Sequence, residues 1–209
     1  MSIRRNEHVF ICGGTGSGKT LLAVIMLAYR QEHIVVLDTK GKFNWMGLVS
    51  ENDNTYYYTL KDLTTSDIKT RKVIYRPIAP ELNTQYYDKF FEWCYNRGNN
   101  IVVVDEAAQV CKNAMNYPEY YRHILQRGRE LDVGIWSLSQ RPSNINVDII
   151  AQSLHYYIFR LNNINDRKKI ASSSGQDSFI RKVNGHNFLY WRADVDVEPE
   201  LCVLNINNI

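Results

Sequence analysis

The sequence predicts an α/β fold with a mostly parallel central β-sheet, flanking helices, and antiparallel strands at the C-terminal end. Three observations predict this class. Short apolar runs alternate with helix-like segments over most of the chain, which is typical of right-handed crossovers between parallel strands. Residues 101–104 (Ile-Val-Val-Val) have the β-branched composition of a buried central strand. After about residue 177, strand-like runs follow closely, with the hairpin-turn signal Asn184-Gly185 between two of them.

In the first half of the chain, we expect a buried strand over residues 8–12 (His-Val-Phe-Ile-Cys) and a helix over residues 18–30. The helix is predicted by apolar residues at helical spacing: Leu21, Leu22, Ile25, Met26 and Tyr29. The remaining elements expected here are strands at residues 34–37 and 72–75, a helix at 86–96 and the strand at 101–104.

In the second half, the elements expected up to residue 161 are a helix at 119–131, a strand at 133–138, a short helix at 147–152 and a strand at 156–161. The antiparallel strands are expected at residues 180–183, 188–192 and 201–206. Because no repeat or linker interrupts the pattern, we expect one domain over residues 1–209. Its core covers about 8–161, and its C-terminal strand extension covers about 177–209.

Composition bears on three kinds of partner: nucleic acid, zinc and a membrane. The 209 residues carry a formal net charge of +3, which permits a nucleic-acid partner without requiring one. The four cysteines and five histidines are scattered, which favours reduced core thiols and gives a zinc site no support. No segment approaches the roughly 18–20 apolar residues that cross a bilayer. We therefore expect a cytoplasmic protein without a membrane partner.

A phosphate-binding loop lies between the first predicted strand and helix. Its residues are Gly13, Gly14, Thr15, Gly16, Ser17, Gly18, Lys19 and Thr20, a full match to GxxxxGK[ST]. The glycines let successive N–H groups converge on the β-phosphate, and the start of the helix adds partial positive charge. We expect Lys19 to reach the β- and γ-phosphates of ATP and the Thr20 hydroxyl to bind Mg²⁺.

Two carboxylates, Asp105 and Glu106, follow the strand at residues 101–104. An Asp at this position supplies the negative charge that Mg²⁺ needs, and Glu106 is placed to polarise the attacking water. Glu106 favours ATP hydrolysis over a nucleotide kinase, because kinases usually lack this residue. GTPases need an NKxD motif, and the nearest sequence, residues 163–166 (Asn-Ile-Asn-Asp), lacks the lysine.

Two further groups are candidates for the hydrolysis site. Gln140 follows the strand at residues 133–138 and can sense the γ-phosphate from the tip of that strand. Arg127 and Arg129 lie near a helix end, where an arginine can project into a neighbouring subunit. From their spacing alone, salt bridges to Glu130 or Asp132 remain the favoured interpretation for both arginines.

The order of these motifs resembles the HerA/FtsK superfamily of ATP-driven DNA pumps. The resemblance covers roughly residues 8–192 and is most specific in GRELDVGIWSLSQRP (128–142) and in DTKG (38–41). It implies an additional-strand, conserved-glutamate (ASCE) P-loop fold that forms rings around DNA. It also implies that Asp105 holds magnesium, Glu106 is the catalytic base and Gln140 is the sensor. With the resemblance, Arg129 becomes the favoured trans-acting finger and Arg127 the second choice.

Within this superfamily, so small a chain is most like the viral genome-packaging ATPases. That assignment implies double-stranded DNA bound without sequence readout, a homo-oligomeric ring, contact with capsid portal or vertex proteins, and a location in the host cytoplasm with transient docking at the procapsid vertex. The expected DNA contacts are Lys40, Lys42, Arg71 and Lys72, although Lys40 has the alternative of touching a nucleotide phosphate. The alternatives are a plasmid or cellular motor acting in conjugation or repair, a nucleotide-gated DNA-binding scaffold and, remotely, a small-molecule kinase.

Overall fold

The structure is a computed structural model that describes residues 3–111, 113 and 115–205. Its nine described strands form one sheet in the order β3-β4-β2-β5-β6-β1-β7-β8-β9. Neighbours from β3 to β7 pair in parallel, while β8 and β9 are antiparallel additions next to β7. The predicted α/β class, with a mostly parallel sheet and antiparallel C-terminal strands, is therefore confirmed.

The strands are β1 (Val9–Cys12), β2 (His33–Leu37), β3 (Asn54–Tyr57), β4 (Lys72–Tyr75), β5 (Asn100–Val104), β6 (Val133–Ser139), β7 (His155–Phe159), β8 (Asn187–Arg192) and β9 (Glu200–Val203). The α-helices are α1 (Lys19–Ala28), α2 (Leu60–Thr65), α3 (Thr84–Arg97), α4 (Ala107–Val110), α5 (Glu119–Arg127), α6 (Val147–Ala151) and α7 (Ile164–Ser174). Short 3₁₀ helices are η1 (Glu51–Asp53), η2 (Ala79–Glu81), η3 (Gly128–Leu131), η4 (Pro142–Asn144) and η5 (Asp177–Ile180). Among the described residues, no helix is both long enough and apolar enough to span a membrane.

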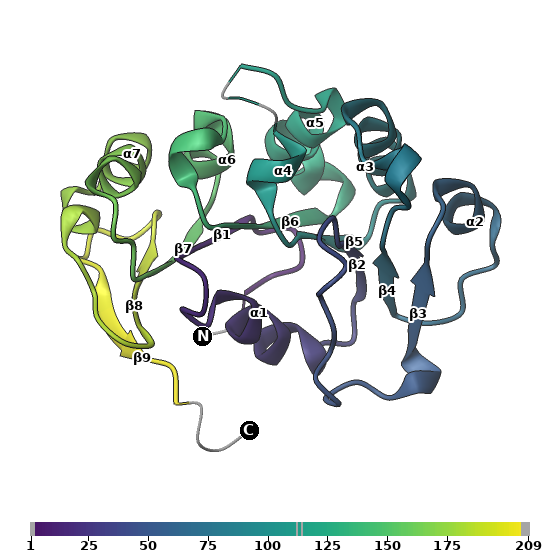
Figure 1. Cartoon of the computed structure of the whole chain (residues 1–209), viewed down its shortest axis with the longest axis horizontal. Helices are drawn as coiled ribbons and strands as arrows, with labels where there is room; N and C mark the ends of the chain where they lie inside the picture. Colours follow the sequence, from purple (N-terminus) through teal and green to yellow (C-terminus); the bar gives the residue numbers. More distant parts are fainter. Residues whose placement is uncertain (1–2, 112, 114, 206–209) are drawn as a thin grey trace.

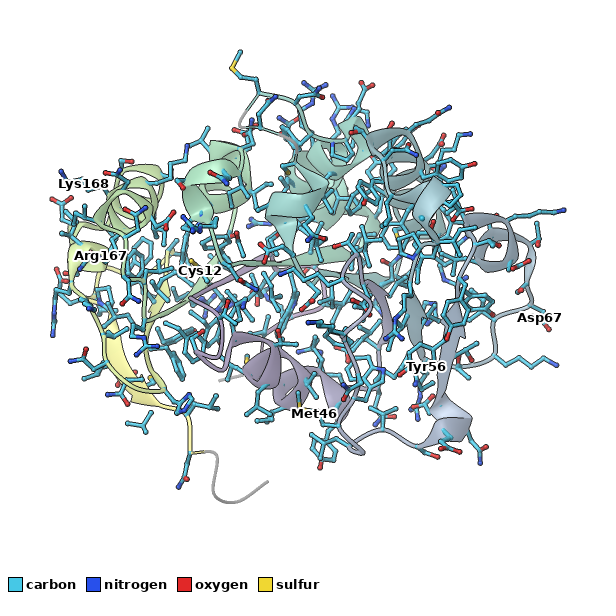
Figure 2. All side chains as sticks on the ribbon, in the orientation of Figure 1. Cys12, Met46, Tyr56, Asp67, Arg167 and Lys168 are labelled. Atoms are coloured by element: carbon cyan, nitrogen blue, oxygen red, sulfur yellow. The ribbon has the colours of Figure 1, made fainter. Side chains whose placement is uncertain are left out.

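The two faces of the sheet are covered unequally. Helices α3 to α7 lie on one face, and α1 lies on the other (Figure 1). Side chains alternate between the faces as the strand period of two requires. In β2, for example, Val35 and Leu37 pack toward the many-helix face, whereas Ile34 and Val36 pack toward α1. Figure 2 shows Cys12 in the interior, while Arg167 and Lys168 on α7 lie at the outer edge.

The C-terminal region differs from the prediction in one strand. Residues 180–183 are not a strand: Ile180 ends η5, and the following residues run as a loop into β8. The buried side chains of Phe179 and Val183 explain the apolar pattern without strand pairing. Asn184 and Gly185 therefore form the turn that leads into β8, and the hairpin connection is instead residues 193–199, between β8 and β9.

Four strands or α-helices, β3, α2, α4 and α7, were absent from the prediction, and one helix is shorter. Strand β3 and helix α2 lie in a polar stretch at the sheet edge, and α7 has a polar sequence with few apolar positions. The helix expected at residues 119–131 changes at Gly128 into η3. A Cβ at Gly128 would lie 2.8 Å from the carbonyl oxygen of Val133, so the close approach of η3 to β6 requires glycine.

Candidate active site

The phosphate-binding loop lies at the carboxyl edge of the sheet, between β1 and α1. Gly16 and Gly18 have φ values of 72° and 103°, which L-residues with a side chain rarely adopt. The loop is fixed to both neighbouring strand ends, because Gly13 N–H donates to Ser139 O at 3.1 Å and Gly14 N–H donates to Arg160 O at 3.0 Å. The loop is thus a rigid cradle whose shape depends on β6 and β7.

Helix α1 begins in this cradle with its positive end open. Among the described residues, no side chain caps the helix at Gly18. Lys19 is buried, with 6% of its surface exposed, and no described residue forms an ion pair or hydrogen bond with its ammonium group. Burial lowers the pKa of Lys19, and the negative charges of Glu106 and Asp105 act in the opposite direction. A buried, unpaired cation beside uncapped N–H groups is suited to binding a phosphate anion.

The predicted magnesium ligands lie together. Thr20 Oγ1 donates to Asp105 Oδ1 at 3.2 Å, which joins the start of α1 to the end of β5. Burial raises the pKa of the Asp105 carboxyl, and the nearby charge of Asp38 raises it further. The two oxygen donors fit Mg²⁺, which prefers hard oxygen ligands and keeps several waters and phosphate oxygens in its shell. A bound Mg²⁺ would offset the repulsion between the negative charges of Asp105 and Asp38.

Glu106 is buried at the same edge with both carboxylate oxygens engaged. Oε1 accepts from the Gln140 backbone N–H at 3.1 Å and from the Ser139 hydroxyl at 3.3 Å. Oε2 accepts from Lys40 Nζ at 2.6 Å. Sequence reasoning found Glu106 but missed the Lys40 contact, whose signal was the DTKG segment directly after β2.

Gln140 links the end of β6 to the phosphate-binding loop. Its side-chain Oε1 accepts from Thr15 Oγ1 at 2.9 Å, and its backbone holds Glu106. A residue that contacts both groups is positioned to respond to a γ-phosphate between them. The structure therefore brings Lys19, Thr20, Asp105, Glu106 and Gln140 to one place at the carboxyl edge of the sheet.

Arg127 and Arg129 lie at the opposite edge. Both precede β6, whereas Gln140 follows it, and a seven-residue strand spans about 23 Å. Asn6, which precedes β1, donates from its side chain to Arg129 O. Among the described residues no ion pair joins either arginine to Glu130 or Asp132, and Asp132 pairs with Arg5 instead. Neither arginine can reach the phosphate-binding loop of its own chain.

The four predicted DNA-contact residues do not form one patch. Lys42 is exposed beside the loop that carries Lys40. Arg71 precedes β4 at the amino edge and pairs with Asp53 at 2.9 Å. Lys72 is fully buried and donates to Arg30 O, so its ammonium group is not accessible to a nucleic-acid phosphate. The prediction for Lys72 is corrected on that ground.

Two residues near the site, Asp38 and His186, were given no role of their own in the sequence analysis. The buried Asp38 carboxylate accepts from the backbone N–H groups of Lys42 and Phe43 at 3.1 and 3.0 Å, and from Arg76 Nε at 2.9 Å. These bonds fix the loop that follows β2. On the other side of the cradle, His186 Nδ1 lies 3.3 Å from Ser17 O and lines a pocket of about 290 Å³ over the start of α1.

The fold is similar to those of solved P-loop ATPases. The genome packaging NTPase B204 of Sulfolobus turreted icosahedral virus 2, in complex with AMPPCP, is 14% identical with a TM-score of 0.73, covering 94% of this chain and 97% of that one. The DNA-packaging ATPase B204 of Sulfolobus Turreted Icosahedral Virus is 17% identical with a TM-score of 0.74, covering 97% and 100%. EssC (ATPases 2 and 3) of Geobacillus thermodenitrificans is 14% identical with a TM-score of 0.57, covering 94% of this chain and 39% of that one.

No protein-family model matches the sequence, and a search of curated proteins gives no match. At 14–17% identity, the structural likeness speaks for the fold alone. The P-loop ATPase fold that the sequence motifs predicted is therefore confirmed. The chain has a P-loop NTPase fold.

Proposed function

We propose that this chain is an Mg²⁺-dependent ATPase that drives double-stranded DNA, and that it packages a viral genome. The observation that carries the ATPase part is the convergence of Lys19, Thr20, Asp105, Glu106 and Gln140 at the carboxyl edge of the sheet. In open α/β sheets, ligands bind at this edge. An uncapped helix start, a buried lysine and a carboxylate pair are the parts that hydrolysis of a nucleoside triphosphate requires.

In the proposed mechanism, the phosphate-binding loop and Lys19 hold the triphosphate. Thr20 and Asp105 would hold Mg²⁺, which when bound supplies positive charge to the β- and γ-phosphate oxygens. Glu106 Oε2 accepts a proton from the attacking water once its bond with Lys40 is released. Gln140 contacts the γ-phosphate from the end of β6 and links its presence to the position of Glu106.

Packaging of double-stranded DNA is supported by the extent of the likeness to the two B204 structures. The alignment covers at least 97% of each viral chain, whereas it covers 39% of the EssC chain. The similarity to the viral chains therefore extends over nearly their whole length. We propose that it acts in the host cytoplasm, docks transiently on capsid portal or vertex proteins, and is one domain over residues 1–209.

We further propose that the working form is a homo-oligomeric ring in which Arg129, or else Arg127, completes the neighbour's site. The support is geometric, since both arginines are exposed at the amino edge and neither forms a described salt bridge with Glu130 or Asp132. DNA phosphates would contact Lys42, Arg71 and, on release from Glu106, Lys40.

The test is a coupled assay of phosphate release and movement. With Mg·ATP, the wild-type chain is expected to release phosphate, faster with duplex DNA, and to displace streptavidin from the end of a biotinylated duplex. Lys19→Ala is the matched inactive control and should show neither activity. ATP hydrolysis with DNA binding but no streptavidin displacement would remove the motor function and leave the nucleotide-gated scaffold. Phosphate transfer to nucleosides instead of water would identify a kinase.

A further inference from the structure

The sheet ends at β9, whose outer edge is open (Figure 1). On one side β9 pairs with β8, and among the described residues no strand pairs with its other side. Leu204 N–H donates to His186 O, and backbone groups alternate in direction along an antiparallel strand, so those of Cys202 also face β8. The N–H and C=O groups of Leu201 and Val203 therefore point away from the sheet. Such an edge can pair with one further extended strand.

The side chains along this open edge are apolar and exposed. Leu201 and Val203 are 56% and 71% exposed, and they project from the same face because they lie two positions apart in β9. The loop before β9 adds the exposed Val195 and Val197. Together with Trp191 they line part of a largely apolar pocket of about 350 Å³. Trp191 Nε1 donates to Val197 O at 2.9 Å, which fixes the loop against β8. A partner that covers this edge would bury apolar surface.

The charge around β9 is strongly acidic. Residues 193–209 contain no Lys or Arg, although the whole chain has a net charge of +3. Their acidic residues are Asp194, Asp196, Glu198 and Glu200. Asp194 pairs with Arg192 at 2.7 Å, whereas the other three are exposed and form no ion pair with a described residue. An edge of this charge repels nucleic-acid phosphates and attracts lysine and arginine side chains.

We propose that β9 is a docking edge for an extended segment of a partner protein in which basic residues alternate with apolar ones. The alternation follows from β9 itself, because Glu200 projects from the face opposite to Leu201 and Val203. The segment adds a strand beside β9, buries its apolar side chains on Leu201 and Val203, and directs its basic side chains toward the acidic residues. This inference deepens the proposed docking on capsid portal or vertex proteins and rests on that proposed function. A second copy of this chain fits less well, because two β9 edges would bring two acidic clusters together.

The experiment measures the binding of labelled synthetic peptides to the whole chain by fluorescence anisotropy. The probe is a short peptide of alternating lysine and valine. The comparison peptides are lysine–serine, which keeps the charge without the apolar face, glutamate–valine, which reverses the charge, and an N-methylated lysine–valine peptide, which cannot pair as a strand. The lysine–valine peptide is expected to bind at least about tenfold more tightly than each of the others, because it alone offers all three interactions.

Two variants at one position separate backbone pairing from apolar contact. Val203→Pro removes an outward N–H without removing a bond to β8, and it should weaken binding of the lysine–valine peptide by about fivefold. Val203→Lys places a charge on the apolar face and should weaken binding by about tenfold. Val147→Lys is the matched control, since Val147 is an exposed valine at the start of α6, and it should leave the affinity unchanged.

A charge reversal tests the acidic residues independently of β9 pairing. Asp196→Lys combined with Glu200→Lys should weaken binding of the lysine–valine peptide by at least about tenfold and should allow the glutamate–valine peptide to bind. Asp67→Lys is the control, because Asp67 is an exposed carboxylate at the opposite end of the molecule from β9 (Figure 2). Urea unfolding of each variant establishes that it is folded before its binding is compared.

The inference is overturned if the lysine–valine peptide does not bind, binds no better than lysine–serine, or binds every folded variant equally. It is also overturned if the wild-type chain forms dimers that Val203→Lys dissociates and the peptide does not, because a second copy would then cover β9. The proposed function is tested separately, since phosphate release and streptavidin displacement need no peptide. Loss of both activities with variant-sensitive peptide binding would refute ATP-driven packaging and keep the docking edge. Intact activities without peptide binding would refute the docking edge alone.

Discussion

The two edges of the parallel sheet have different chemistry. The carboxyl edge holds the phosphate-binding loop, the Asp105–Glu106 carboxylates and Gln140, linked by hydrogen bonds of 2.9–3.2 Å. The amino edge holds Arg127 and Arg129, which are exposed and separated from that site by the length of β6. The carboxyl edge therefore carries the residues that we propose to bind a triphosphate, whereas the amino edge presents the exposed side chains of Arg127 and Arg129. In a ring, the amino edge of one copy would serve the carboxyl edge of the next.

The largest effect that tests this comparison is expected for Arg129→Ala in the assembled protein. Loss of an arginine finger should lower kcat by roughly 10³-fold. Mixing Arg129→Ala with Lys19→Ala should restore part of the activity, because a mixed ring contains sites with an intact loop and a neighbour's intact arginine. Arg127→Ala is the matched control with a smaller loss. Full activity of Arg129→Ala in the ring would remove the trans role of this residue.

At the carboxyl edge, Glu106→Gln should lower kcat by about 10² to 10⁴-fold, the range for the contribution of a general base. ATPγS should still bind, because the loop and Lys19 are unchanged. Glu130→Gln supplies the matched control, since Glu130 is an exposed carboxylate at the amino edge. Steady-state phosphate release and equilibrium binding are the two measurements. Equal activity of the Glu106 and Glu130 variants would contradict the assignment of Glu106 as the base.

A smaller effect is expected at the loop that carries Lys40. Arg76→Met would leave the fully buried Asp38 without its cationic partner, although two backbone N–H bonds remain. Loss of one hydrogen bond to a charged group should lower the free energy of unfolding by about 2 to 3 kcal/mol. Urea unfolding at pH 7 measures this, with Arg122→Met on the surface of α5 as the control. An unchanged midpoint would mean that the loop does not depend on this pair.

The smallest effect concerns His8, buried beneath Arg129 at the amino edge. Burial, together with the charge of Arg129, lowers the pKa of His8 from 6.5 to about 4. The unfolded chain therefore binds a proton at a higher pH than the folded chain, so stability is complete above about pH 7 and falls as the pH drops through 6.5 toward 4. Between pH 7 and 5, the expected loss is about 1 to 2 kcal/mol. His8→Gln should reduce this pH dependence in urea unfolding, and an unchanged slope would rule out His8 as its source.

Local motifs were enough to predict the fold class and to name the groups that the structure brings together. The phosphate-binding loop is contiguous in sequence. Asp105 and Glu106 directly follow a strand whose apolar, β-branched composition is typical of a buried strand. Contacts between distant loops were not predictable in the same way. The hydrogen bond between Lys40 and Glu106 joins residues 66 positions apart, and Lys40 lies in the loop that Asp38 anchors. Spacing alone likewise could not distinguish the buried Lys72 from an exposed lysine.

Strand β6 runs between the two edges of the sheet. Every one of its residues is buried, and both neighbouring strands pair with it in parallel. Gln140 therefore follows one end of this buried strand, and Arg129 precedes the other end. In the proposed ring, β6 would therefore connect the nucleotide site of one subunit to the surface that meets the next subunit.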